Sequence, residues 1–141
     1  MAYRIIIDTN VLFAALRSNK GASFKLLSII DDNRIQISLS VPLVLEYEEV
    51  LLRERLQLGL TTNDIAEVLD YLCSIAEQKT IHYLWRPFLS DVKDDMVLEL
   101  AVESESSYIV TFNKRDFSGC ETFGITAVTP KEFLNKLGEL P

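Results

Sequence analysis

Histidine, cysteine and glycine are scarce in this 141-residue chain, which contains one histidine, two cysteines and five glycines. The two cysteines, Cys73 and Cys120, are too few and too far apart for a disulfide framework or a thiolate metal site. The one histidine, His82, lies in a strand-like segment, where a lone histidine is more often structural than catalytic. If the protein binds a metal ion, we therefore expect oxygen ligands rather than nitrogen or sulfur ligands.

Long apolar runs and an excess of positive charge are also missing. No run approaches the roughly 18 apolar residues that a membrane helix needs, and the start of the chain lacks the pattern of a signal peptide. We therefore expect a cytoplasmic protein. The chain has 14 lysines and arginines against 21 aspartates and glutamates, a formal charge of −7. This balance argues against nucleic-acid binding by bulk charge, unless several of the acids hold a metal ion.

Strand-like and helix-like patterns alternate along the chain, and its length predicts a single domain over residues 1–141. The strand-like segments are 3–8, 34–40, 80–85, 106–113 and 125–129. The helix-like segments begin near residue 10 and then cover 21–31, 41–56, 60–78, 93–104 and 129–137. Such alternation is typical of an α/β fold in which a parallel sheet carries helices on both faces.

Two helix starts carry a strong local signal. Thr61 lies three residues before Asp64, which predicts a capping box at the start of segment 60–78. Thr129 is followed by Pro130 and, three positions after the threonine, by Glu132, which predicts a second capping box with proline in the first turn.

Polar side chains follow two of the predicted strands at the point where each strand ends. The run RIII, apolar after its arginine, leads directly into Asp8, Thr9 and Asn10, and segment 106–113 ends with Thr111 and Asn113. Ligands of open parallel sheets bind outside the carboxyl ends of the strands. We therefore expect these side chains to meet at a ligand site.

Acidic residues of three further segments are expected at the same edge. Asp94 and Asp95 open helix 93–104, Glu46 lies early in helix 41–56, and Asp116 follows the fourth strand. Each aspartate at a helix start could be a simple cap, but clustered carboxylates repel one another unless a cation is bound. An all-oxygen site suits Mg²⁺ or Mn²⁺, which support phosphodiester hydrolysis. The threonines and asparagines at the two strand ends would orient the carboxylates or metal-bound waters.

Three stretches of the chain, IIIDTNVLFAAL, LVLEYEEVLLR and DDMVLELAVESESSYIVTFNKRDF, occur in the order and spacing found in PIN-domain proteins. Together they resemble the branch described as toxin components of bacterial and archaeal toxin–antitoxin pairs, over nearly the whole chain. The resemblance implies a three-layer α/β/α fold with a mostly parallel sheet, and a metal-dependent endoribonuclease. It also implies an antitoxin partner and a homodimer or higher homo-oligomer.

The resemblance also assigns site residues. The four acids of the family, which would be catalytic and hold Mg²⁺ or Mn²⁺, fall on Asp8, Glu46, Asp95 and Asp116. Glu49, one turn after Glu46, is a rival for the second position. The third position is judged by its distance to VTFN, and Asp94 beside it either shares the ligation or caps the helix.

Several alternatives remain open from the sequence. Lys114 and Arg115 are the first candidates for contacts with RNA phosphates, and Arg53 and Arg55 are alternatives. A phosphatase with an aspartyl nucleophile would resemble a DxDxT pattern, but Asn10 stands in place of the second aspartate. A non-catalytic PIN-like module that docks protein or RNA is the remaining hypothesis.

Overall fold

The protein is described by a computed structural model that covers residues 2–81, 89 and 91–139. Five strands form one sheet in the order β3-β2-β1-β4-β5, and every strand pair is parallel. The strands are β1 (Tyr3–Ile7), β2 (Ile35–Leu39), β3 (Glu77–Gln78), β4 (Tyr108–Val110) and β5 (Thr126–Val128). The predicted α/β class with a parallel sheet is confirmed. Most of the predicted strand 80–85 lies outside the described residues, and the short β3 precedes it.

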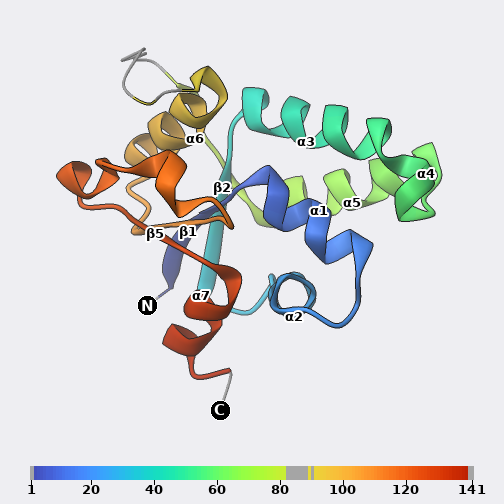
Figure 1. Cartoon of the computed structure of the whole chain (residues 1–141), viewed down its shortest axis with the longest axis horizontal. Helices are drawn as coiled ribbons and strands as arrows, with labels where there is room; N and C mark the ends of the chain where they lie inside the picture. The colour runs from blue at the N-terminus through green and yellow to red at the C-terminus, as the bar shows by residue number, and fades with distance from the viewer. Residues whose placement is uncertain (1, 82–88, 90, 140–141) are drawn as a thin grey trace.

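Helices connect the strands and cover the sheet (Figure 1). They are α1 (Thr9–Arg17), α2 (Ala22–Ser28), α3 (Val41–Arg53), α4 (Arg55–Leu58), α5 (Thr62–Ile75), α6 (Val92–Glu103) and α7 (Pro130–Leu137), with short 3₁₀ turns η1 (Lys114–Phe117) and η2 (Cys120–Phe123). Both predicted capping boxes are present, at the starts of α5 and α7. Among the described residues, none of the helices is long and apolar enough to cross a bilayer.

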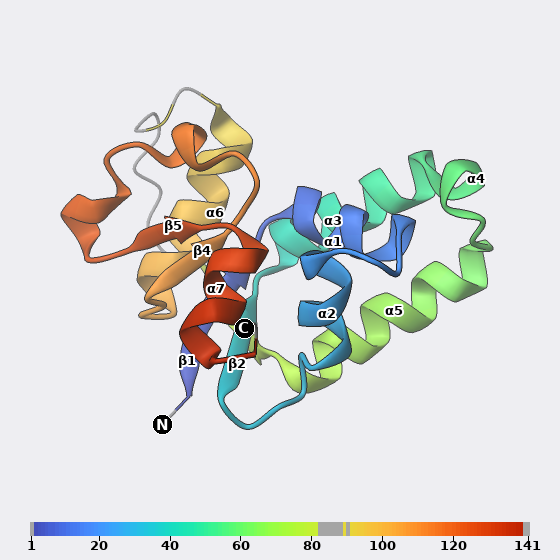
Figure 2. The same ribbon diagram turned by 60° about the horizontal axis from the view of Figure 1, so that its bottom comes forward.

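The first two residues of β1 show how the layers are arranged. Successive side chains of a strand point to opposite faces of the sheet. The Tyr3 ring packs edge-on against Phe133 of α7 at 5.8 Å between ring centroids, whereas the Arg4 guanidinium donates to the Ser104 carbonyl at the end of α6. Helices α7 and α6 therefore cover opposite faces, as Figure 2 shows with α7 in front of the strands and α6 behind them.

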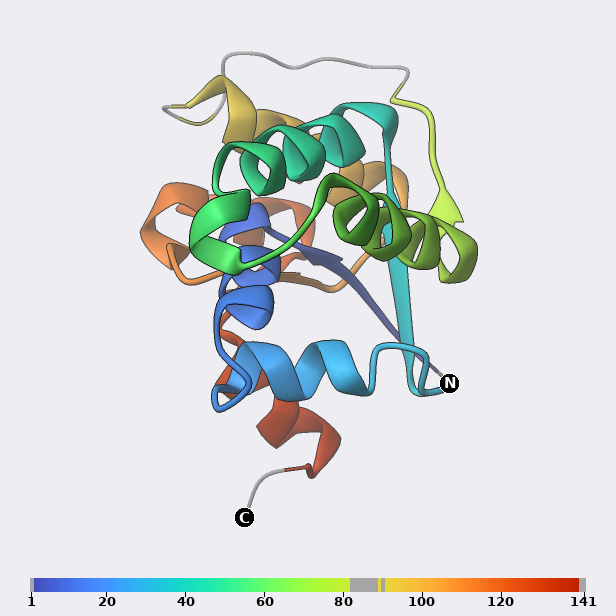
Figure 3. The same cartoon turned by 90° about the vertical axis from the view of Figure 1, so that its right-hand side faces the viewer.

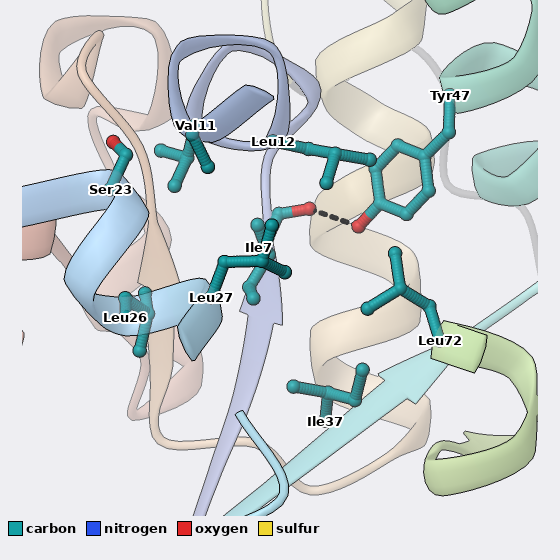
Figure 4. A pocket seen from close by; sticks show the side chains of 10 residues that line it. Ile7, Val11, Leu12, Ser23, Leu26, Leu27, Ile37, Tyr47 and Leu72 are labelled. Carbon is teal, nitrogen blue, oxygen red and sulfur yellow. Dashed lines mark hydrogen bonds between the residues drawn. The ribbon is translucent and has the colours of Figure 1, made fainter. Parts of the chain in front are cut away.

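The core joins β1 directly to α3. Ile5, Ile6 and Ile7 are almost fully buried, as expected for a central strand that is covered on both faces. The Tyr47 hydroxyl, buried on α3, donates a hydrogen bond to the Ile7 carbonyl (Figure 4). Around this bond lie apolar side chains from α1, α2, β2 and α5. A core contact thus fixes α3 against the end of β1, which is where the polar residues begin.

Candidate active site

A cleft of about 630 Å³ lies at the carboxyl edge of the sheet, where β1 ends. Six acidic residues line it, and four of them come from four separate elements: Asp8 after β1, Glu46 on α3, Asp94 on α6 and Asp116 in η1. The other two are Asp91, the N-cap of α6, and Glu54, which follows α3. The parallel topology explains this convergence, because each strand end and each following helix start come to the same edge. Three of the four acids from separate elements are among those that the family resemblance suggested, and the fourth, Asp94, is the neighbour of the suggested Asp95.

Asp8 is the most buried of these four acids, with a relative solvent exposure of 8%. It is the N-cap of α1, and its Oδ1 accepts from the Thr9 backbone N–H at 2.9 Å. Its Oδ2 accepts from the Thr111 hydroxyl at 2.8 Å. The backbone N–H of Asp8 also donates to the Val110 carbonyl, which extends the pairing of β1 with β4 to the site. The Thr9 N–H at the start of α1 and the Thr111 hydroxyl directly after β4 therefore orient the two carboxylate oxygens.

Thr111 and Asn10 connect the two strand ends further. The fully buried Thr111 hydroxyl accepts from the Asn113 N–H at 3.0 Å, and the Asn10 side chain accepts from the Phe112 N–H at 3.3 Å. Asn113 itself lines the cleft beside Asn10. The polar residues predicted at the strand ends thus form one hydrogen-bonded group beneath the carboxylates.

Glu46, rather than its rival Glu49, reaches the cleft. The Glu46 carboxylate accepts a hydrogen bond from the Thr9 hydroxyl, which ties α3 to the first turn of α1. Glu49 is exposed and is not part of the cleft lining. The adjacent Tyr47 points into the core, so the rotation of α3 that buries this ring also turns Glu46 toward Asp8.

The two aspartates at the start of α6 occupy different environments. Asp94 is half-buried and lines the cleft. Asp95 is 1% exposed, and its Oδ1 accepts from the Leu89 backbone N–H at 2.7 Å. Capping is performed by Asp91, whose side chain accepts from the Lys93 N–H. The structure thus brings Asp94 to the other three acids and places Asp95 behind them.

Asp116 is the acid that η1 contributes to the cleft. The η1 turn is anchored by Phe117, which is fully buried, so the preceding Asp116 lies exposed at the cleft. Its backbone N–H donates to the Asn113 carbonyl, which closes the turn after β4.

The charges of these acids are coupled. Burial raises the pKa of Asp8 to about 6, and the charges of Glu46 and Asp116 add to the rise against the lowering effect of the Thr111 and Thr9 hydrogen bonds. Burial, followed by the charges of Asp8 and Asp116, raises the pKa of Asp94 to about 7. Burial and, to a smaller extent, the repulsion among the carboxylates thus favour the protonated forms of Asp8 and Asp94.

The donor chemistry of the cleft fits a hard divalent cation, because Asp8, Glu46, Asp94 and Asp116 offer only oxygen ligands. A bound cation would also offset the repulsion that, together with burial, raises the pKa values of Asp8 and Asp94. As the side chains stand in the described part of the chain, no group of three or more His, Cys, Asp or Glu residues is arranged to hold a metal ion.

Basic side chains lie at the cleft in a pattern that the sequence only partly indicated. Arg17, Arg53 and Lys93 line it. Of the residues predicted to contact RNA phosphates, Lys114 forms a 3.1 Å ion pair with Glu132 on the far side of η1. Arg115 lines a neighbouring hollow that shares Asn113 and Asp116 with the cleft. Arg55 does not reach the cleft, because its guanidinium donates to the Leu52 carbonyl.

Sequence comparison identifies the fold family. A family model described as the PIN domain matches residues 4–115, which include Asp8, Glu46 and Asp94 and end one residue before Asp116. This chain belongs to the PIN-domain family. No curated protein sequence matches it. As a PIN domain it is structurally similar to a chain in the crystal structure of VapBC2 from Rickettsia felis bound to a DNA fragment from their promoter. The TM-score is 0.62 at 13% identity, over 89% of this chain and 98% of the other. PIN domains are generally nucleases, and the cleft lies at the edge of the sheet where parallel α/β folds bind ligands.

Proposed function

We propose that this PIN domain is an endoribonuclease that hydrolyses phosphodiester bonds of RNA with Mg²⁺ or Mn²⁺. The observation that carries the proposal is the convergence of Asp8, Glu46, Asp94 and Asp116 on one cleft. A divalent cation held there would activate a water and stabilise the charge that builds on the scissile phosphate. Without it, the acidic end of the cleft would repel a phosphodiester.

The roles of the chain's own residues follow from their contacts. Asp8 and Glu46 would hold the cation, since Thr9 and Thr111 already orient their oxygens. We propose Asp94 rather than Asp95 as the acid of α6 that faces the cation, because only Asp94 lines the cleft. Asp95 would position the start of α6 through its bond to the Leu89 N–H.

Asp116 would act from η1, and the neighbouring Arg115 would contact the substrate backbone. The Arg115 guanidinium has no ion pair or hydrogen bond with any described residue, so it is available for a phosphate. Lys114 would contribute less, because Glu132 already neutralises its charge.

The proposal is tested by incubating the purified protein with a mixed RNA pool in Mn²⁺, Mg²⁺ or EDTA. We expect cleavage with either cation and none in EDTA. Glu46→Gln should abolish cleavage, whereas Glu49→Gln, the same change one turn away on the exposed side of α3, should leave it intact. Cation-induced thermal stabilisation without cleavage of any RNA would refute the nuclease and favour a non-catalytic PIN-like binding module.

We also propose that the protein is the toxin of a toxin–antitoxin pair and forms homodimers or higher homo-oligomers. The toxin branch that the sequence resembles, and the fold shared with a chain of VapBC2, support this proposal. Co-expression with the product of the adjacent gene should yield a stable complex and relieve growth arrest. A monomer by light scattering would contradict the oligomer, and unchanged growth on expressing the protein alone would contradict the toxin.

A further inference from the structure

The cleft extends well beyond the four acids, along the groove between α1 and α3. Both helices begin near the carboxyl edge of the sheet and run side by side toward α4 (Figures 1 and 3). The Thr9 hydroxyl, in the first turn of α1, bonds to Glu46 of α3, which sets the two helices level with each other at the acidic end. Positions at equal distances along the two helices therefore face each other across the cleft.

Each helix presents a polar, then an apolar, then a basic side chain to this cleft. On α1, Asn10 is followed by Phe13 and then by Arg17. On α3, Glu46 is followed by Val50 and then by Arg53. The spacings of three, four and seven residues keep each series on one helix face. Along these two series the cleft changes from polar and acidic at the sheet, through apolar, to two arginines at its outer end, where Glu54 and Gln57 also line it.

The two arginines lie at nearly the same height above the acids. Arg53 is seven residues beyond Glu46 and Arg17 is eight beyond Thr9, so both are roughly 10–12 Å along the helix axes at 1.5 Å per residue. The Arg17 guanidinium lies over the Phe13 ring at 5.4 Å, which holds it at the cleft. Arg53 forms a 3.2 Å ion pair with Glu54, which also lines the cleft, through Nε. This pair offsets part of its charge but leaves its two terminal nitrogens to bond a phosphate.

We propose that this cleft binds the single-stranded RNA substrate on one side of the scissile bond. A base would pack against Phe13 and Val50, and a phosphate beyond it would be held by Arg17 and Arg53. Aromatic faces accept any base, and arginine pairs with phosphate oxygens in a bidentate manner. At 3.4 Å or more per nucleotide, the arginines would reach a phosphate roughly two to three nucleotides from the acids. The inference rests on the proposed nuclease function and adds the path of its substrate.

Binding in EDTA tests this path without cleavage. An eight-nucleotide, fluorescein-labelled single-stranded RNA is titrated with protein by fluorescence anisotropy at several NaCl concentrations. Arg17→Gln and Arg53→Gln should each lower the slope of log K against log [salt] by about 0.7, the value for one lost phosphate contact on a single strand. Arg55→Gln is the matched control, with the same charge change two residues away but outside the cleft. Its slope should equal that of the wild type.

The apolar part of the path is tested by Phe13→Leu, which keeps bulk but removes the ring. We expect RNA binding to weaken roughly fivefold or more, as for loss of a stacked base. Melting temperatures of all variants identify any that fail to fold, and Val50→Thr gives a second, milder change in the same section of the cleft.

Steady-state cleavage then separates this inference from the nuclease proposal. The two cleft-arginine variants should raise KM and leave kcat nearly unchanged. If the wild type cleaves RNA while both variants match Arg55→Gln in KM and salt slope, the substrate path is refuted and the nuclease stands. If RNA binding by both variants depends less steeply on salt than binding by the wild type, but the wild type cleaves no RNA with either cation, the substrate path stands and the nuclease is refuted.

Discussion

Asp8→Asn should stabilise the metal-free protein even though it removes a residue of the proposed active site. Burial and the charges of Glu46 and Asp116 hold the pKa of Asp8 near 6, against an ordinary value of 3.8. The folded protein therefore binds this proton more tightly than the unfolded chain does. Stability contributed by this group is complete below about pH 4 and is lost as the pH rises to about 6. Above that, the metal-free fold carries the full cost of an ionised Asp8.

The size of this cost follows from the shift. At about 1.4 kcal/mol per pKa unit, the rise from 3.8 to about 6 corresponds to roughly 3 kcal/mol near neutral pH. Asparagine still offers an oxygen to the Thr9 N–H, but the bond from the Thr111 hydroxyl must reverse or be lost, at about 1 kcal/mol. A net gain of about 2 kcal/mol remains, which corresponds to a Tm increase of roughly 6 °C for a domain of this size.

Thermal unfolding of the wild type and Asp8→Asn in EDTA, from pH 4 to pH 8, measures this effect. The difference in Tm should be near zero at pH 4 and grow up to about pH 6–7. Adding Mn²⁺ at pH 7.5 should raise the Tm of the wild type, because a ligand that binds only the folded state stabilises it, and should do so much less for the variant. A variant that melts below the wild type in EDTA at pH 7.5 would refute the electrostatic argument.

Three further predictions concern neighbouring groups. Asp94→Asn should abolish cleavage and raise the metal-free Tm slightly, because Asp94 is only half-buried and solvent screens its repulsion. Asp95→Ala should instead lower the free energy of unfolding by about 1–3 kcal/mol, and the Tm with it, because the buried Leu89 N–H loses its acceptor. An unchanged Tm would contradict this prediction. Thr129→Ala should cost about 1 kcal/mol by removing the cap of α7, without changing cleavage, as urea unfolding and the RNA assay would show.

Much of the fold could be predicted because its signals are local. The capping boxes at Thr61 and Thr129 involve residues three positions apart, and the structure contains both. The apolar runs of β1 and β4 predicted central strands with polar residues at their ends, and these strands are neighbours in the sheet. The short β3 carried no such signal, since Glu77 and Gln78 follow the amphipathic α5 without an apolar run.

The sequence alone could not show which aspartate at the start of α6, Asp94 or Asp95, lines the cleft. Neighbouring residues on a helix point about 100° apart, so choosing between Asp94 and Asp95 requires knowing how the helix is rotated. An amphipathic helix reveals its rotation, but α6 buries seven consecutive residues, from Asp95 to Ala101. Its pattern therefore contains no exposed face beyond the first turn, and packing against the sheet decides which aspartate is exposed.

The sequence did not identify Arg17 as a candidate phosphate-binding residue, for a different reason. The helical spacing of Asn10, Phe13 and Arg17 was visible, as was that of Glu46, Val50 and Arg53. Two matching helix faces would have been a usable signal. Only the structure shows that α1 and α3 lie beside each other, level at Thr9 and Glu46.

The hydrogen bond from Tyr47 to the Ile7 carbonyl has a consequence for how this protein can evolve. Each of its two residues is the direct chain neighbour of a cleft acid, Glu46 in one case and Asp8 in the other. A one-residue insertion or deletion in either element would exchange a core group for a carboxylate, so it would disrupt folding before it could produce a misaligned site. Selection for stability alone would therefore preserve the spacing of these two acids, even in a descendant that no longer used them.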